Sequence, residues 1–338
     1  MRVADALLAA QAARFERLDP LLPPAVAPPD GDVLTAALPD GERVAGVLTR
    51  ANHPAGSAAT LWSPAQVWEL HPLVGDVGGA GTEALLREWR RVLDRVPPGV
   101  DSACTVTWPS RDVEAAGPLL RHGFVPLTIL AVRVGAADVV ADEGAEVADG
   151  DLARDATDSA VSGGAGGRAE GVGGDLVVRV ATGRDLDVVL ELELVELAYS
   201  AQVGAAIVRA DARQVRRAAL VRHLEQGDPV WLAEQGGVVV GAAHCRVVEV
   251  GAGSAGAGRL PVGRWGYVNS VSVRPEVRGA GVGRRLMDVA HRGLRQWGAG
   301  RTFLYFNPPN PLSPGFWARQ GYRPLWTIWE VRPAGAMR

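Results

Sequence analysis

The chain has 338 residues, of which 47% are hydrophobic and 22% charged, and its formal net charge at pH 7 is −3. These proportions lie near the averages of globular proteins, so they exclude a wholly disordered chain and the strongly basic surface typical of nucleic-acid binding. The length exceeds that of a typical single domain and predicts two globular units.

The cysteines and the first residues favour a soluble, cytoplasmic protein. Cys104 and Cys245 are the only cysteines, too few for a disulfide framework, so we expect two buried thiols in a reducing compartment. The segment Met1–Leu22 carries Asp5 and Arg14 within its apolar pattern and predicts an amphipathic helix rather than a signal peptide. We expect no membrane and no nucleic-acid partner, and a homodimer remains open.

In chain order, the amphipathic helix is followed by a hairpin over Val33–Arg50, where alternating apolar residues flank a glycine turn. GAGTEALL at Gly79–Leu86 then opens a helical pattern, and PLLRHGFVPLTILAVR at Pro118–Arg133 ends the block. The next stretch, 135–175, is rich in Asp, Glu, Gly and Ala and has no aromatic residue. This composition predicts a disordered linker between a domain over 1–134 and a second over 176–338.

The second block has more elements than the first. It begins with a strand and a helix capped near Thr182 with Asp185 in its first turn. The elements that follow are a helix over Asp211–Glu225, a hairpin over Val230–Arg246, a strand over Trp265–Val273, a helix over Arg284–Trp297, a strand over Thr302–Phe306, a short helix over Gly315–Gln320 and a strand over Pro324–Val331.

The two blocks resemble each other along their length. GAGVGRRL at Gly279–Leu286 matches GAGTEALL, and the block ends pair Gly123 with Gly321 and Pro126 with Pro324. Because the hairpins fall in the same order, the chain reads as a tandem duplication of one α/β unit. The first copy lacks room for the opening strand and the second helix, and we interpret it as truncated.

The turn at Arg278–Gly283 has the chemistry of an anion site. Its glycines let the backbone approach a ligand, the first amides of the next helix are unpaired, and Arg278 and Arg284 add positive charge. The spacing fits neither a P-loop, which needs Gly-Lys before Ser or Thr, nor the dinucleotide motif GxGxxG.

These residues resemble the GNAT superfamily of acyl-CoA-dependent N-acetyltransferases. R-G-A-G-V-G at Arg278–Gly283 matches the family motif Q/R-x-x-G-x-G/A. VNSVSVRP is similar to the fourth strand of the family, and NPLSPGFWARQGYRP is similar to its N-x-x-A-x-x-F-Y-x-x-x-G-F helix. The resemblance covers Leu176–Pro333, and a weaker one covers Val33–Arg133. It implies two tandem GNAT-like α/β units, each a mixed, mostly antiparallel twisted sheet flanked by helices, with a degenerate N-terminal copy.

The resemblance also implies the residues that hold acetyl-CoA, or another acyl-CoA. Strand residues would hold the pantetheine arm, the glycine turn the pyrophosphate, and the later helix the cofactor in the cleft. Together the implied cofactor residues are Val271, Ser272, Val273, Arg278, Gly279, Ala280, Gly281, Val282, Gly283, Arg284, Asn310, Phe316 and Trp317.

The chain departs from the family at the acid and base positions. Trp317 stands where many members have a Tyr that protonates the leaving thiolate, and the strand holds no Glu. Candidate catalytic groups are therefore the Val271 N–H as oxyanion donor, Glu249 or His244 as base, and Tyr305 as acid. Candidate substrate-binding residues are Tyr199, Tyr267 and Asn269.

The first copy differs where charge matters. Gly78 stands at the position of Arg278 and Glu83 at that of Gly283, which removes a cation and adds a carboxylate. We expect that this copy no longer binds the cofactor and packs against the second, where it shapes the substrate cleft or extends a shared sheet.

The function implied is acetyl transfer from acetyl-CoA to a primary amine of a small molecule or peptide by the C-terminal domain, with no metal. Two alternatives stay open. One is a non-catalytic acyl-CoA sensor or scaffold, favoured by Trp317 and by the missing strand carboxylate. The other is an acetyltransferase like mycothiol synthase, which also has two GNAT domains.

Overall fold

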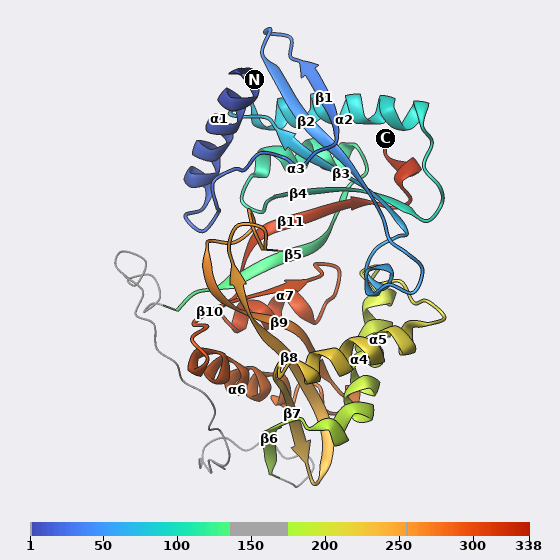
Figure 1. Cartoon of the computed structure of the whole chain (residues 1–338), viewed down its shortest axis with the longest axis vertical. Helices are drawn as coiled ribbons and strands as arrows, with labels where there is room; N and C mark the ends of the chain where they lie inside the picture. Colours follow the sequence, from blue (N-terminus) through green and yellow to red (C-terminus); the bar gives the residue numbers. More distant parts are fainter. Residues whose placement is uncertain (1, 136–174, 255) are drawn as a thin grey trace.

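Each half of the chain contains a hairpin with a glycine turn, as the alternating apolar pattern predicts. A computed structural model describes residues 2–135, 175–254 and 256–338 (Figure 1). Apart from its two end residues, the predicted linker over 135–175 lies outside the described residues. No helix among the described residues is both long and apolar enough to cross a bilayer.

The N-terminal half contains three helices and five strands. The predicted helix over Met1–Leu22 ends at Leu18, because Pro20 disfavours helical geometry at the residue before it. The elements are α1 (Arg2–Leu18), β1 (Asp32–Ala37), β2 (Arg43–Asn52), the short η1 (Ala58–Leu61), β3 (Gln66–Leu73), α2 (Gly78–Arg95), β4 (Ser102–Pro109), α3 (Val113–Arg121) and β5 (Val125–Arg133).

The C-terminal half repeats the order hairpin, strand, helix, strand, helix, strand, and adds a strand and two helices before it. A capping box of Thr182 and Asp185 starts its first helix, as predicted. The elements are β6 (Leu176–Val180), η3 (Gly183–Asp185), α4 (Leu186–Gln202), α5 (Ala212–Glu225), β7 (Val230–Gln235), β8 (Val238–Val250), β9 (Gly263–Val273), η4 (Pro275–Val277), α6 (Val282–Gln296), β10 (Arg301–Phe306), α7 (Ser313–Arg319), β11 (Arg323–Val331) and η5 (Ala334–Ala336).

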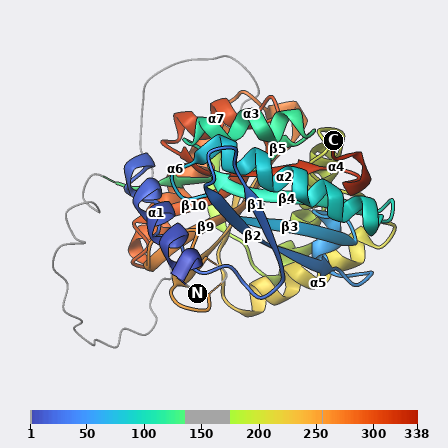
Figure 2. The ribbon, with the colours of Figure 1, turned by 90° about the horizontal axis from the view of Figure 1, so that it is seen from above.

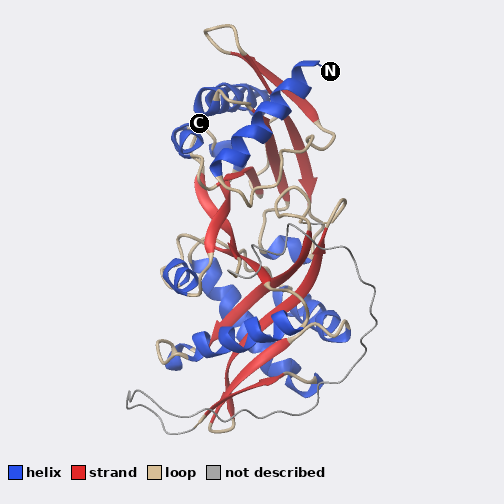
Figure 3. Cartoon of the chain, turned by 90° about the vertical axis from the view of Figure 1, so that its left-hand side faces the viewer, coloured by secondary structure: helices blue, strands red, loops and turns tan. Residues whose placement is uncertain are grey.

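The eleven strands of the described residues join one sheet in the order β1-β2-β3-β4-β11-β5-β10-β9-β8-β7-β6. The two crossover pairs, β3 with β4 and β9 with β10, are parallel, and the other pairs are antiparallel. Figure 3 shows that the sheet extends along the long axis of the molecule, from the N-terminal half to the C-terminal half. The mixed, mostly antiparallel twisted sheet flanked by helices confirms the predicted fold class.

The two halves exchange their last strands. β5 lies between β11 and β10, and β11 lies between β4 and β5, so each half completes the sheet of the other (Figure 1). One hydrophobic core also crosses the junction, because Trp108 and Leu130 share a cluster with Trp265 and Trp326. The halves are therefore joined by both hydrogen bonds and apolar packing.

The helices cover both faces of the sheet, with α3 and α7 on one side and α5 on the other (Figure 2). In the C-terminal half, Gly241 of β8 approaches Leu286 of α6. On the opposite face the Ser272 hydroxyl of β9 donates to the Leu192 carbonyl of α4 at 2.8 Å. Strands β8 and β9 thus present one face to α6 and the other to α4.

Candidate functional site

The parallel strands β9 and β10 diverge at their carboxyl ends. Their ladder ends at the pair Val268–Leu304, whereas β9 continues to Val273. Beyond Val268, no other described strand borders β9 on that side. An edge of this kind offers unpaired N–H and C=O groups to an extended ligand.

The direction of the β9 backbone follows from its pairing with β8. The Arg274 N–H donates to the Val240 carbonyl at 2.9 Å, and Ser272 is the Cα partner of Ala242 in the same register. Because backbone groups alternate in direction along an antiparallel strand, those of Val271 and Val273 point away from β8. The Val273 carbonyl accords with this, since it accepts a hydrogen bond from Arg278 Nε at 3.1 Å.

The glycine turn leads directly into α6. Gly279 and Gly281 have φ of 84° and 86°, a left-handed conformation that favours glycine. A Cβ atom on either residue would meet no atom within 4 Å. Helix α6 begins at Val282, two residues before the predicted start, and the first amides of this 15-residue helix follow an open turn flanked by the exposed Arg278 and Arg284. Ala280 is exposed in the same turn.

Residues of α7 support this turn from the side. The Phe316 ring lies 3.4 Å from the position that a Cβ on Gly283 would take, so it packs on the first turn of α6. Asn310 uses its side-chain oxygen to accept the Leu312 N–H at 2.9 Å. Trp317 is buried and makes an edge-to-face contact with Tyr322, with the ring centroids 5.4 Å apart. Phe316 thus lies beside the turn, while Trp317 belongs to the core.

A buried charged group lies on the α4 face of β8. Glu193 of α4 accepts hydrogen bonds from His244 Nδ1 at 2.9 Å and from Arg216 of α5 at 2.7 Å, and Glu193 and His244 are 3% and 2% exposed. Burial alone would raise the pKa of Glu193, but the hydrogen bond from His244 and the charge of Arg216 outweigh it and lower that pKa. His244 Nε2 is buried with no hydrogen-bond partner among the described residues.

Glu193 and Arg216 were missed in the sequence. Glu193 lies within the apolar stripe of α4, between the buried Leu192 and Leu197, and a carboxylate on a buried helix face was the available signal. Glu196, one turn from Ser200, accepts the Ser200 hydroxyl at 2.7 Å, and burial raises the pKa of this carboxyl. Two carboxylates with opposite pKa shifts therefore lie beside the imidazole.

The predicted aromatic residues gather around the divergent strands. The rings of Tyr267 and Tyr305 are in an edge-to-face arrangement with their centroids 6.2 Å apart. The Arg246 guanidinium lies over the Tyr267 ring, 5.1 Å from its centroid. Burial raises the pKa of Tyr267 to about 12, whereas Tyr305 is 37% exposed. Asn269 is the extra residue of a β-bulge between the pairs His244–Ser270 and Cys245–Val268.

Tyr199, predicted to bind substrate, lies beside the glycine turn, whereas Glu249, predicted as a base, lies on the surface away from it. The Tyr199 ring lies 5.3 Å from the Arg278 guanidinium, so α4 reaches the glycine turn. Glu249 lies five residues beyond His244 along β8, is exposed, and pairs with Arg264 at 2.8 Å. The structure therefore brings His244 together with Glu193 and Arg216 and leaves Glu249 in a surface ion pair.

The corresponding region of the N-terminal half has a different form. Gly78–Gly81, which match the turn in sequence, are already helical in α2, and a Cβ on Gly78 would lie 2.0 Å from Glu114 Oε2. Glu83 pairs with Arg121 at 2.9 Å and His122 at 3.1 Å, so the repulsion expected from its charge is compensated. The side chains of Glu114 and Arg14 therefore fill the space at the start of α2, whereas the space beside the glycine turn before α6 is open.

The comparisons with known proteins agree with this geometry. A model of the acetyltransferase (GNAT) family matches residues 196–322. A GCN5-related N-acetyltransferase from Sphaerobacter thermophilus superposes with a TM-score of 0.53 at 15% identity, over 98% of this chain and 93% of that chain. This likeness shows that nearly the whole chain shares the fold of that structure.

Shorter solved structures match less of the chain. A predicted acetyltransferase from Clostridium acetobutylicum with acetyl-CoA has a TM-score of 0.37 at 15% identity, over 44% of this chain and 90% of that chain. An aminoglycoside antibiotic 6′-N-acetyltransferase from Acinetobacter haemolyticus has a TM-score of 0.35 at 15% identity, over 44% and 92%. No curated protein matches. The resemblance to mycothiol synthase and the tandem duplication stay predictions. The family match covers residues 196–322 of the C-terminal half, the segment that carries the divergent strands and the glycine turn.

Proposed function

We propose that the C-terminal half, residues 176–338, transfers an acetyl group from acetyl-CoA to a primary amine on a small molecule or peptide. The divergence of β9 from β10 after Val268 carries this proposal, because it leaves the backbone of Val271 and Val273 on an edge that no other described strand borders and that leads into the glycine turn of α6. The N-terminal half serves as a partner in packing rather than as a second transferase.

The residues along the unpaired edge of β9 and in the glycine turn fit an acyl-CoA. Backbone groups of Val271 and Val273 would pair with the amides of the pantetheine arm, with Ser272 between them fixed to α4. The turn at Gly279–Gly283 would hold the pyrophosphate, because the space beside both left-handed glycines is open and α6 begins there with amides that have no partner within the helix. Arg278 and Arg284 would add charge-assisted hydrogen bonds.

The bound thioester supplies the carbonyl carbon that the amine nitrogen attacks: a C–N bond forms, the C–S bond breaks, and the thiolate leaves. The Val271 N–H would stabilise the charge that develops on the carbonyl oxygen. His244 is the base of this proposal, because Glu193 holds its Nδ1–H and its Nε2 has no partner among the described residues. The ammonium group of the acceptor first gives a proton to Nε2, directly or through water, and the neutral amine then attacks. The tetrahedral intermediate loses a second proton from nitrogen, which balances the proton that the thiolate gains.

Two tyrosines could return a proton to the thiolate. Tyr305, on the strand that diverges, is the more accessible, and burial keeps the neighbouring Tyr267 protonated to high pH. Trp317, at the usual tyrosine position, has no acidic proton and is part of the core. The acceptor would enter on the α4 side, past Glu196, Tyr199 and Asn269, where the Glu196 carboxyl can meet an ammonium group.

Calorimetric titration with acetyl-CoA tests the proposal first. We expect one site per chain, lost in Gly281→Asp, because a side chain there fills the turn and adds negative charge. Gly41→Asp is the matched control: Gly41 also has a left-handed φ of 90° and open space around it, but lies in the β1–β2 hairpin. Two sites per chain would contradict the role proposed for the N-terminal half. The absence of any site would contradict the proposal that the glycine turn holds the pyrophosphate.

A panel of primary amines, assayed by release of free thiol, tests the transfer step. We expect thiol release that depends on both acetyl-CoA and amine. Binding of acetyl-CoA without release on any amine of the panel would favour the sensor over the enzyme.

A further inference from the structure

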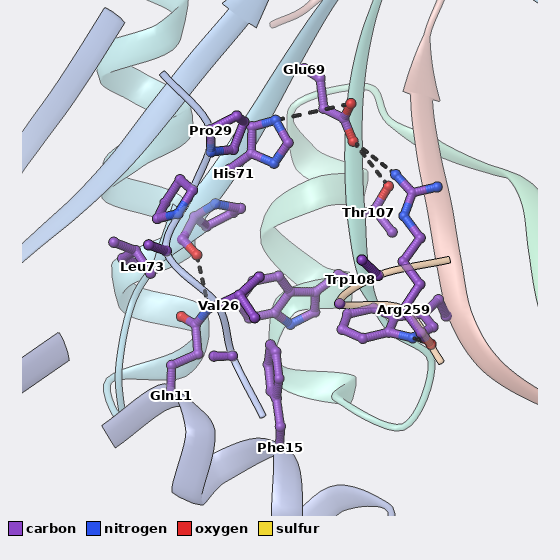
Figure 4. A pocket seen from close by; sticks show the side chains of 17 residues that line it. Gln11, Phe15, Val26, Pro29, Glu69, His71, Leu73, Thr107, Trp108 and Arg259 are labelled. Atoms are coloured by element: carbon purple, nitrogen blue, oxygen red, sulfur yellow. Dashed lines mark hydrogen bonds and ion pairs between the residues drawn. The ribbon is translucent and has the colours of Figure 1, made fainter. Parts of the chain in front are cut away.

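A pocket of about 400 Å³ lies in the N-terminal half where β3 and β4 diverge. Their parallel ladder ends at Leu70–Val106, while β3 continues to Leu73 and β4 to Pro109. Side chains of α1, β3, β4 and β11, the segment 25–29 and the loop residues 257–259 line it (Figure 4). The volume lies within the range of small-molecule sites.

The backbone of this pocket is already occupied by a side chain of the same protein. The Gln11 amide donates to the Pro72 carbonyl at 3.0 Å and accepts the Val74 N–H at 2.9 Å. At the comparable end of β9 in the C-terminal half, the Val273 carbonyl accepts only the Arg278 side chain of the glycine turn, and no described side chain of another element spans the strand end as Gln11 does. The groups that would pair with a pantetheine arm are thus already satisfied, and the ligand class must differ from acyl-CoA.

One wall of the pocket carries two opposite charges. Glu69 accepts the Thr107 hydroxyl at 3.2 Å, and the Arg259 guanidinium lies 3.5 Å from the same carboxylate oxygen. The other Glu69 oxygen is 4.0 Å from His71 Nε2, beyond hydrogen-bond distance, and so keeps acceptor capacity. Burial lowers the pKa of His71, with Arg259 acting in the same direction and Glu69 against it, which favours the neutral ring.

The remaining walls are apolar and fixed. The Phe15 ring makes edge-to-face contacts with Trp108 and Trp326, with ring centroids 5.6 and 5.5 Å apart. Trp108 donates its indole N–H to Asp112 at 3.0 Å, and Trp326 donates to the Arg259 carbonyl at 2.7 Å. The second bond holds the loop that carries Arg259 against β11, so the charged wall and the aromatic wall form one preformed site (Figure 4).

We propose that this pocket binds a free α-amino acid with an aromatic or branched apolar side chain. The ammonium group would bond to the available Glu69 oxygen, the carboxylate to the Arg259 guanidinium, and the side chain would lie against Trp108 and Trp326. An α-amino acid presents both charges within a few ångströms, which matches a carboxylate and a guanidinium 3.5 Å apart. This site is separate from the acetyltransferase site and does not depend on it.

Calorimetric titration of the full chain without acetyl-CoA tests this proposal, so a failed transferase assignment would not affect the result. The probes are L-phenylalanine, phenethylamine, which lacks the carboxylate, and 3-phenylpropionate, which lacks the ammonium. We expect one site for L-phenylalanine and affinities at least about tenfold weaker for the two analogues.

Two variants locate the site. Glu69→Gln and Arg259→Gln should each weaken L-phenylalanine binding by about tenfold or more, while circular dichroism and the melting temperature stay near those of the wild type. Glu225→Gln, an exposed glutamate at the end of α5, is the matched control and should bind like the wild type. No binding up to about 10 mM, equal binding of phenethylamine, or binding unchanged in both variants would each overturn the proposal.

Discussion

At the scale of single residues, the polar group of Glu193, His244 and Arg216 is the least expected part of the molecule. A buried carboxylate is tolerated because two donors, at 2.7 and 2.9 Å, replace its lost hydration. The second imidazole nitrogen has no such partner among the described residues. The ring of His223 stacks on that of His244 at 5.5 Å and shares its buried environment. Glu193 thus fixes the orientation of the imidazole through Nδ1, while Nε2 is left for another partner.

Replacing His244 with Asn tests the role of Nε2. The Asn amide can still donate to Glu193 from near the Nδ1 position, but it has no atom at Nε2. We expect kcat for amine acetylation to fall by about 10² to 10⁴, with the KM for acetyl-CoA nearly unchanged. Steady-state kinetics with His53→Asn as control measures this, and a variant with wild-type kcat would rule His244 out as base.

At the scale of elements, a small polar network joins α6 to β10 and β11. His291 of α6 shares a hydrogen bond of 2.9 Å with the Tyr322 hydroxyl, which also bonds Thr302 of β10 at 2.9 Å. All three side chains are buried, and burial lowers the pKa of His291 from 6.5 to about 3. Because the folded state disfavours the protonated ring, the network is stable only while this histidine is neutral.

The pH dependence of unfolding follows from that shift. Between about pH 6.5 and 3 the unfolded chain binds a proton at His291 that the folded chain excludes, so stability falls as the pH falls through this window. His291→Gln keeps a donor near Nε2 but does not titrate. We expect the wild type to lose about 2 to 3 kcal/mol more than this variant between pH 7 and 4.5.

Urea unfolding at the two pH values measures this difference. Equal losses in the wild type and in His291→Gln would show that other groups cause the acid sensitivity.

At the scale of the whole molecule, the exchange of last strands makes the halves interdependent. β5 has both of its neighbours in the C-terminal half, and β11 lies between two strands of the N-terminal half. Contacts near α4 and α5 add to this: Ile207 N–H donates to the Leu61 carbonyl at 2.8 Å, and Arg209 pairs with Asp101 at 3.0 Å. The N-terminal half therefore supports the helices on the acceptor side of the proposed site.

Separate expression of residues 1–134 and 176–338 tests this interdependence. Each fragment would expose the unpaired edges of the strand that it normally exchanges, so we expect neither to fold alone and the two together to restore the native circular dichroism. The full chain should unfold in a single transition. Two resolved transitions, or a fragment with native-like structure, would show that the halves are independent domains.

Local patterns of the sequence were sufficient for the elements and for part of the site. The hairpins, the helix after the Thr182–Asp185 cap and the glycine turn at Arg278–Gly283 depend on residues within a few positions of one another, so the sequence predicts them directly. The backbone direction of Val271 and Val273, predicted only through a family resemblance, follows from pairing with β8.

Other features depend on contacts between distant residues, and only the tertiary structure decided them. Last-strand exchange depends on which of several possible neighbours pairs with β5 and β11, and an apolar strand pattern is the same in either arrangement. Glu193 and His244 are 51 positions apart, and their partnership requires α4 to pack on β8. Gln11 reaches β3 in the same way. Periodicity identifies which face of an element is buried, but the choice of its partner is made by packing across the whole chain.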